Sequence, residues 1–303
     1  MRLNRVDLNL LISLDALLNE RNVTRAAAKL HVTQSAMSWT LARLREHFGD
    51  PLLTRTGRDM TPTSFASELI GPVRELLLRA QVVVEQRPDR PIDTIERVFR
   101  ISASDYSALT ILAEAMRRIS EQAPGIRIEL RSLADYTSER LSSGETDLLI
   151  SAKPSLHPAH PREPLVIDRY VGIVASNNAE VGDRVTLEQF SSMGHVATRW
   201  RGLNMVTIDE MAIRALALTR REEVVVPEFT FAPAFIVDTR RIATIQYRLA
   251  QIFAKQWPIR IVELPIELPP IELLMQWHSD RGDDPALAWL RRLLQTVVAD
   301  HGV

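Results

Sequence analysis

The sequence contains no cysteine, which excludes disulfide bonds, thiol catalysis and cysteine-ligated metal sites. It has only 11 glycines in 303 residues. They form no phosphate-cradling loop, no dinucleotide fingerprint and no Gly-Xaa-Ser-Xaa-Gly nucleophile elbow. The seven histidines show no metal-ligand spacing, and His157 and His160 share a proline-rich loop that we expect to be solvated. An enzymatic function is therefore disfavoured, and no catalytic residue, metal or cofactor is predicted.

Long apolar runs are also missing. No stretch of about 18 apolar residues is present, so we expect no transmembrane helix. The N-terminus lacks the continuous apolar stretch of a signal peptide. Together with the absence of cysteine, these features favour a cytoplasmic protein. A net charge of −1 argues against a uniformly basic nucleic-acid binder, so binding of this kind has to depend on a local excess of basic residues.

Residues 21–48 predict two short helices joined by a tight turn. Thr24 is the expected N-cap of the first helix and Thr33 that of the second, because each hydroxyl can accept from a free backbone N–H. Apolar residues recur at helical spacing in both segments and predict their buried faces. These residues are Ala26, Ala27, Leu30 and Val32 in the first helix, and Met37, Leu41, Leu44 and Phe48 in the second.

The opposite face of the second helix is polar, with small hydrogen-bonding side chains at its N-terminal end and arginines further along. This pattern suits a DNA major groove, where such side chains reach base edges and arginines bind phosphates. Residues 52–63 then predict two short strands with a glycine-containing tip, the wing of a winged helix-turn-helix. The alternative for residues 21–48 alone is an ordinary helix pair in a bundle. The predicted DNA contacts are Thr33, Gln34, Ser35, Ser38, Trp39, Arg43, Arg45, Arg55 and Arg58.

An ordered series of short motifs runs through residues 7–63. It comprises Asp7-Leu8-Asn9-Leu10-Leu11, Asn22-Val23-Thr24-Arg25-Ala26-Ala27, Thr33-Gln34-Ser35-Ala36-Met37-Ser38, Leu41-Ala42-Arg43-Leu44-Arg45, Asp50-Pro51-Leu52-Leu53-Thr54-Arg55 and Thr61-Pro62-Thr63. The series resembles the DNA-binding domain of LysR-type transcriptional regulators. Its opening motif and residues 71–75 are most similar to the nodulation-regulator and aromatic-catabolism branch. Trp39 departs from the small, amide or arginine side chains of many relatives, which leaves the operator sequence open.

A long helix is predicted from Pro62 to Glu85, with Thr61 as its N-cap and Pro62 in its first turn. Its apolar stripe favours pairing with the same helix of a second subunit over packing within its own domain. Between Arg25 and Arg58, six basic residues face two acidic ones, an excess that provides few phosphate contacts per subunit. Both features favour a dimer or a tetramer, as the resemblance also implies. The stripe is formed by Leu69, Val73, Leu76, Leu77, Ala80, Val83 and Val84.

Residues 95–303 alternate predicted strands and helices, which indicates mainly parallel α/β sheets. Chain crossings near 154–168 and 262–270 divide this part into two lobes. The arrangement resembles the periplasmic-binding-protein architecture, which LysR-type regulators carry as their effector-binding domain. The predicted strands are 98–103, 126–130, 147–151, 170–175, 194–198, 223–226, 242–245, 259–262 and 272–277, and the predicted helices are 109–120, 137–143, 186–191, 204–218, 233–237, 247–253 and 285–299.

The predicted chain is therefore multidomain. An N-terminal all-α winged helix-turn-helix with a long linker helix precedes an α/β periplasmic-binding-protein-like effector domain of two lobes. The predicted boundaries are 1–62 for the DNA-binding domain, 63–94 for the linker helix and hinge, and 95–303 for the effector-binding domain. Lobe I is predicted to contain 95–163 and 268–303, and lobe II 164–267.

Polar side chains follow several predicted strands, and in open α/β sheets ligands bind beyond the carboxyl ends of strands. Helix N–H groups and arginines there suit an anionic group, while Tyr106 and Trp200 suit an aromatic ring. The resemblance adds His195 and the 242–244 region. At each position the alternative is a side chain that only caps a helix. The candidate effector-binding residues are Ser104, Tyr106, Asp135, Thr137, Ser151, His195, Thr198, Trp200 and Thr244.

These features predict a bacterial LysR-type regulator that binds promoter DNA as a homo-oligomer and responds to a small aromatic or carboxylated effector. RNA polymerase is a candidate further partner, and no membrane partner is predicted. The alternative is a small-molecule-binding protein whose helical N-terminus is only a dimerisation module. The missing signal peptide weighs against a secreted protein of that kind.

Overall fold

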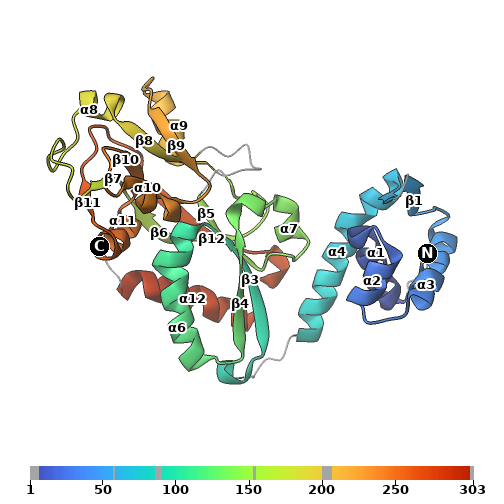
Figure 1. The fold of residues 1–303 in the computed structure, drawn as a ribbon. Coiled ribbons are helices and arrows are strands. Elements are labelled where there is room, and N and C mark those ends of the chain that lie inside the picture. Colours follow the sequence, from blue (N-terminus) through green and yellow to red (C-terminus); the bar gives the residue numbers. More distant parts are fainter. Residues whose placement is uncertain (1–6, 57–58, 86–90, 153–154, 200–206, 301–303) are drawn as a thin grey trace. The chain divides into compact units, whose positions relative to one another are not determined.

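The computed structural model describes residues 7–56, 59–85, 91–152, 155–199 and 207–300. The chain divides into two compact units, the first formed by residues 1–86 with 142–145 and the second by residues 87–141 and 146–303 (Figure 1). Among the described residues, no helix has the length and apolar character needed to cross a membrane.

The first unit is a helix-turn-helix followed by a two-stranded wing and a long helix, the arrangement that the sequence predicts. Its strands pair antiparallel, with Thr54 opposite Thr61. The elements are α1 (Leu8–Glu20), α2 (Val23–Lys29), α3 (Gln34–Phe48), β1 (Leu53–Thr56), β2 (Asp59–Pro62) and α4 (Ser64–Glu85).

Helices α2 and α3 begin at side-chain caps. The hydroxyl of Thr33 accepts from the backbone N–H of Ala36 at 3.2 Å, so the predicted cap of α3 is confirmed. The cap of α2 is Asn22, whose Oδ1 accepts from the N–H of Arg25 at 3.0 Å. The prediction of Thr24 was wrong, because Asn22 already takes the extended backbone conformation of a cap and places Thr24 within the helix.

The long helix α4 starts later than predicted. Its first free N–H groups are met by Thr63, whose hydroxyl accepts from the N–H of Ala66 at 3.0 Å. Thr61 and Pro62 belong to β2 instead, since the wing pairing extends to Pro62 opposite Leu53. The predicted cap at Thr61 was therefore wrong, and the described part of the helix extends to Glu85.

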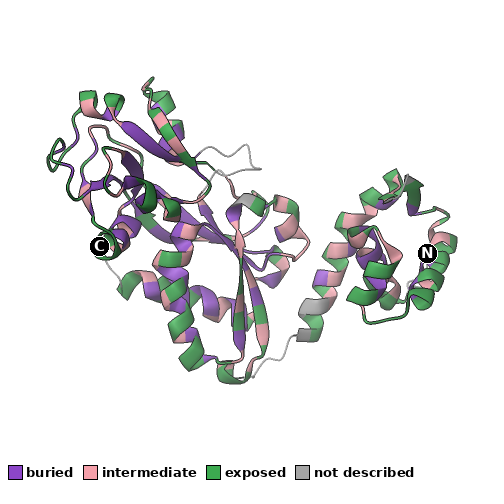
Figure 2. Cartoon of the chain, viewed as in Figure 1, coloured by how far each residue is buried: buried purple, intermediate pink, exposed green. Residues whose placement is uncertain are grey.

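The core of the first unit lies under the inner faces of the three short helices (Figure 2). The predicted buried face of α3 is confirmed, with Phe48 only partly buried, whereas Val32 is 45% exposed at the turn before α3. Full burial of a side chain such as leucine or methionine stabilises the folded unit by about 1.5–3 kcal/mol. The buried residues are Leu14, Ala16, Leu17, Leu18, Ala26, Ala27, Met37, Leu41, Leu44, Leu52, Leu53, Ala66 and Val73.

Helix α4 uses only part of its apolar stripe within the first unit. Val73 is buried in the core, and Leu69 and Leu77 pack against it. Further along the helix, Val83 is 70% exposed and Val84 is 77% exposed. Apolar side chains of this size remain exposed to solvent in a single chain.

The second unit contains two mixed five-stranded sheets, one in each lobe. The first has the order β4-β3-β5-β12-β6, and the second has the order β11-β7-β10-β8-β9. The first-sheet strands are β3 (Arg97–Ala103), β4 (Ile126–Ser132), β5 (Leu148–Ala152), β6 (Arg162–Asp168) and β12 (Ile271–Gln276). The second-sheet strands are β7 (Tyr170–Ala175), β8 (Gly194–Thr198), β9 (Arg221–Val226), β10 (Ile242–Gln246) and β11 (Ile259–Val262).

The helices of the second unit surround these sheets, and α6 packs against α12 beside the first sheet (Figure 1). The predicted helix at 109–120 begins earlier, since α5 and a π-helical turn precede α6 without a break. The described helical elements are η2 (Ile92–Thr94), α5 (Asp105–Ser107), η3 (Ala108–Leu112), α6 (Ala113–Gln122), η4 (Leu133–Asp135), α7 (Ser138–Ser142), α8 (Leu187–Ser192), α9 (Ile208–Ala215), η6 (Phe229–Phe231), α10 (Ala232–Ile236), α11 (Tyr247–Gln256), η7 (Ser279–Arg281) and α12 (Pro285–Asp300).

The sheets are not mainly parallel. Strands β3–β4, β3–β5, β8–β9 and β8–β10 pair in parallel, but β12 and β7 each pair antiparallel with both of their neighbours. Each of these two strands follows a crossing from the other lobe and so enters its sheet in the opposite direction. The predicted parallel sheet was correct only for the βαβ segments.

The first lobe extends further along the chain than predicted. Strand β6, which the sequence did not predict, pairs with β12 through Asp168 opposite Ile271. Residues 164–168 therefore belong to the first sheet, and the chain enters the second lobe between Asp168 and Tyr170. A proline at position 164 obscured this strand in the sequence. One continuous core cluster nevertheless includes side chains from both lobes.

Candidate nucleic-acid interface and ligand site

Helix α3 presents a polar face opposite its buried face. The side chains of Gln34, Ser35 and Ser38 are exposed, and the hydroxyls of Thr33 and Ser35 lie 3.0 Å apart. These residues occupy the first turns of the helix, where backbone N–H groups are still free. The predicted base-contacting side chains are thus together on one accessible surface.

Trp39 lies on the same surface and is 62% exposed. The guanidinium of Arg43 lies over its ring, 4.8 Å from the centroid, and so forms a cation–π contact. A large aromatic side chain left this accessible is available to a binding partner.

Arg45 has a different position from the other predicted DNA contacts. Its Nε donates to the carbonyl of Pro51 at 2.8 Å, and its Nη2 donates to the carbonyl of Leu53 at 2.9 Å. The side chain therefore attaches the last turns of α3 to the start of the wing. Sequence spacing could not distinguish this contact from a phosphate contact, because both use the same guanidinium donors.

The other arginine and lysine side chains between residues 25 and 58 fall into two described groups. Arg25 and Lys29 both pair with Glu20, at 3.6 Å and 3.1 Å. Arg43 and Arg55 are exposed and form no ion pair within the described part of the chain. Arg58 lies outside the described residues. Of the described arginines in this segment, Arg43 and Arg55 are therefore free of ion pairs, whereas Arg45 is already used in contacts with the wing.

In the first lobe, the candidate effector residues lie at the carboxyl ends of strands but differ in accessibility. Ser104 caps α5 and Ser151 is buried within β5. Asp135 and Thr137 are exposed after β4. Tyr106 is 1% exposed and points inward, so it is part of the structure and does not present a ring to solvent.

The hydroxyl of Tyr106 joins the two lobes. It donates to Asp168 Oδ2 at 2.8 Å, and the same oxygen accepts from the backbone N–H of Arg248 in the first turn of α11 at 3.1 Å. Burial and the adjacent Asp168 raise the pKa of Tyr106, so the phenol stays a hydrogen-bond donor. Because Asp168 stands at the crossing, this contact fixes the first lobe to a helix of the second.

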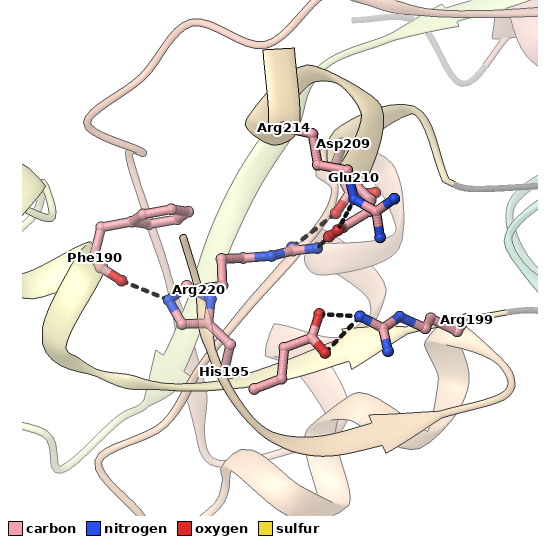
Figure 3. Close-up of polar contacts among 8 residues, drawn as sticks. Phe190, His195, Arg199, Asp209, Glu210, Arg214 and Arg220 are labelled. Atoms are coloured by element: carbon pink, nitrogen blue, oxygen red, sulfur yellow. Dashed lines mark hydrogen bonds and ion pairs between the residues drawn. The ribbon is translucent and has the colours of Figure 1, made fainter. Parts of the chain in front are cut away.

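In the second lobe, His195 is fully buried beneath α8. Its Nε2 donates to the Phe190 carbonyl at 2.6 Å (Figure 3). Burial lowers the pKa of His195 to about 4, so the ring is neutral and its Nδ1 is an acceptor. His195 pairs with Ile242 in the adjacent strand, which places Thr244 and Gln246 on the same face of the sheet.

Charged side chains lie close to this histidine. Arg220 is buried and pairs with Asp209, at 3.0 Å, and with Glu210, while Arg214 also pairs with Glu210, at 2.7 Å (Figure 3). Burial alone would raise the pKa of Glu210, but its hydrogen bonds with Arg214 and Arg220 lower it. The N-terminal turn of α9 is thereby held in place by a compensated charge network.

Several polar atoms near this face are buried and have no hydrogen-bond partner in the described ranges. Buried polar groups are normally hydrogen-bonded, so such a group of atoms is unusual. His195 and Thr244 were predicted as effector-binding residues, whereas Thr207, Asp209 and Gln246 were not. The polar residues that interrupt the apolar run 242–246 could have pointed to Gln246. Thr198 is 9% exposed at the end of β8, and Trp200 lies outside the described residues. The atoms are His195 Nδ1, Thr207 Oγ1, Asp209 Oδ1, Thr244 Oγ1 and Gln246 Oε1.

A winged helix-turn-helix with an exposed polar second helix, followed by a two-lobed α/β unit, defines a DNA-binding regulator with a ligand-binding domain. Comparison with protein families agrees with this class. Residues 8–67 match the bacterial regulatory helix-turn-helix protein, lysR family, and residues 93–299 match the LysR substrate binding domain.

Comparison with individual proteins points to the same class of regulator. The chain is 39% identical to Nodulation protein D 1 of a Bradyrhizobium species, over 99% of the chain and 96% of that protein. It is 41% identical to Nodulation protein D 2 of Rhizobium tropici, over 97% and 93%. A solved structure, a "probable transcriptional regulator" from Pseudomonas aeruginosa, is 30% identical, with a TM-score of 0.66 and coverage of 97% and 98%.

The chain therefore belongs to the LysR family of transcriptional regulators. It is a DNA-binding regulator with an effector-binding domain, and it is not an enzyme.

The position of Arg45 yields a local prediction. Replacing Arg45 by Met keeps the aliphatic chain but removes both hydrogen bonds to the wing, at a cost of about 1–2 kcal/mol. Amide hydrogen exchange in residues 51–56 should accelerate about 5–30-fold, as measured by mass spectrometry of the full-length protein. Arg43→Met is the matched control and should leave exchange in these residues unchanged. Equal exchange in both variants would contradict the assigned role of Arg45.

Proposed function

We propose that α3 enters the DNA major groove and reads base edges through Gln34, Ser35, Ser38 and Trp39. The observation that supports this most strongly is the division of α3 into a buried apolar face and an exposed polar face at its N-terminal end. A buried face fixes the helix to the domain, so the exposed side chains are held in a defined arrangement before DNA is bound.

Arg43 and Arg55 are proposed to bind phosphates, with Arg58, which lies outside the described residues, as a further candidate. Thr33 contributes through its cap, which orients the first turn of α3. Arg45 acts indirectly by holding the wing beside the helix. Phosphate contacts determine affinity and register, whereas the side chains of α3 determine the sequence that is bound.

Helix α4 is proposed as the main contact between subunits. Its exposed Leu76, Val83 and Val84 lie on a helix whose Val73 is buried in the core of the first unit, with Leu69 and Leu77 packed against that core. Pairing with α4 of a second subunit would remove these side chains from water. A dimer or tetramer would also supply more phosphate contacts than one subunit, and a cytoplasmic location gives access to promoter DNA.

The effector is proposed to bind between the lobes as a small aromatic compound with a carboxylate or phenolic group. Support comes from the buried polar atoms of His195, Thr244 and Gln246, and from Ser104 at the carboxyl end of β3. A ligand that fills hydrogen bonds left open in one arrangement of the lobes will favour that arrangement. Asp135, Thr137, Ser151 and Thr198 are the remaining described candidates.

The proposed division of DNA contacts is tested with two variants in a gel-shift assay on DNA upstream of the gene. Ser38→Ala should reduce the preference for the correct site by about 1–3 kcal/mol per lost base contact. Arg55→Gln should weaken binding to all sequences alike. It should also reduce the slope of log affinity against log salt concentration by about one per subunit. Arg117→Gln, an exposed arginine of the second unit, is the control. A uniform loss of affinity for Ser38→Ala would refute this division.

The effector proposal is tested by a thermal-shift screen of carboxylated and phenolic aromatic compounds. A compound at 100 times its Kd should stabilise the protein by about 2.7 kcal/mol. Thr244→Val should leave the ligand-free melting temperature nearly unchanged, because the hydroxyl has no described partner, but should reduce the stabilisation by the ligand. Thr296→Val, whose hydroxyl contacts only the Arg292 carbonyl among the described residues, should behave as the parent protein. The absence of any stabilising compound counts against the proposal.

A further inference from the structure

Two carboxyl groups from different lobes face each other in the second unit. Asp105 is the first residue of α5 and follows β3 of the first lobe, and Glu228 follows β9 of the second. Asp105 Oδ2 accepts from the backbone N–H of Thr230 at 2.7 Å, and the hydroxyl of Ser132 donates to Glu228 Oε1 at 3.4 Å. Each carboxyl group is thus held by a donor from the opposite lobe.

The second carboxyl oxygen of Asp105 needs a hydrogen-bond donor. Asp105 Oδ1 is buried and accepts no hydrogen bond from a donor in the described part of the chain. The carboxyl group of Glu228 lies within hydrogen-bonding reach of the Asp105 carboxyl group. Two ionised carboxylates contain only acceptors, so they would repel each other here. A single proton on Glu228 converts one acceptor into a donor and satisfies Asp105 Oδ1.

The surroundings favour retention of that proton. Burial raises the pKa of Glu228 to about 7, and the charge of Asp105 and the nearby Asp135 of η4 add to this, while the hydroxyl of Ser132 opposes it. Burial also raises the pKa of Asp105, against the hydrogen bonds from Thr230. Because the two groups interact strongly, the titration belongs to the pair.

We propose that Asp105 and Glu228 share one proton that clasps the two lobes together, so that the arrangement of the effector-binding domain depends on pH. The shared proton is held in weakly acidic solution and lost as the pH rises through neutrality. Above that range both groups are ionised, they repel, and the clasp opens.

Proton binding and the clasped arrangement are thermodynamically linked. The pKa of Glu228 is raised in the clasped state, so this state binds the proton more tightly than the open state. The stabilisation is complete below the ordinary value of 4.5 and is lost as the pH rises towards 7. One proton changes the ratio of clasped to open molecules by at most about tenfold per pH unit.

Hydrogen exchange of residues 226–231 in the full-length protein tests the proposal between pH 5.5 and 8, with intrinsic exchange rates corrected for pH. In the parent protein, protection should fall with rising pH, by up to about tenfold per unit. Glu228→Gln keeps a donor but cannot titrate, so its protection should stay constant. Glu188→Gln, at an exposed position on α8, should follow the parent.

Asp105→Asn provides a second variant should Glu228→Gln fold poorly, and its pH dependence should be weaker than that of the parent, because the charge of Asp105 no longer raises the pKa of Glu228. A merely structural role for the pair would lower protection at every pH without changing its slope. The same pH dependence in the parent and in both clasp variants would overturn the proposal. Neither DNA nor an effector is needed, so this result is independent of the proposed operator and effector contacts.

Discussion

Burial of one face of α3 is the constraint on which the DNA-binding unit depends. Met37, Leu41 and Leu44 recur at three- and four-residue intervals and are all less than 5% exposed. Helical geometry then requires the residues between them to face outward, and these are the polar side chains of the predicted interface. The cap at Thr33 sets the start of the helix, and Arg45 fixes the wing to its end. The arrangement of the exposed side chains on α3 is thus fixed by the packing of its buried face.

The second unit depends on contacts that join its lobes at a few residues. Tyr106 reaches Asp168 at the crossing, and Asp168 in turn accepts from the first turn of α11. Asp105, the neighbour of Tyr106, accepts from Thr230 of the second lobe. The three-residue helix α5 therefore carries both connections. A change in the angle between the lobes would therefore alter hydrogen bonds that α5 makes.

Features encoded in local periodicity were predictable from the sequence. The buried face of α3, the antiparallel wing and the strands at 194–198 and 259–262 appear where their residue patterns indicated. Errors arose where neighbouring residues had equal propensity. Asn22 and Thr24 are both good caps, as are Thr61 and Thr63, and only the fold decides which one takes the extended conformation.

Other features depended on contacts between distant parts of the chain. Strand β6 contains a proline and was not predicted, but pairing with β12 makes it a strand. The direction of Arg45 could not be read from its position on α3, since a long side chain can reach either the wing or a phosphate. The contact between Asp105 and Glu228 likewise depends on how the two lobes are placed relative to each other, which local sequence does not reveal. The family resemblance was detectable because its motifs are contiguous in the sequence. The residues of the ligand site come from distant parts of the chain.

We propose that the exposed face of α3 makes the chain a sequence-specific DNA-binding protein. The most direct measurement is the affinity of the purified full-length protein for DNA upstream of its own gene and for unrelated DNA, at two salt concentrations. We expect tighter binding to the upstream DNA, and affinity for both that falls as salt rises, because counterions are released from phosphates. A folded protein that binds neither DNA at either salt concentration, or binds both equally, would contradict this account.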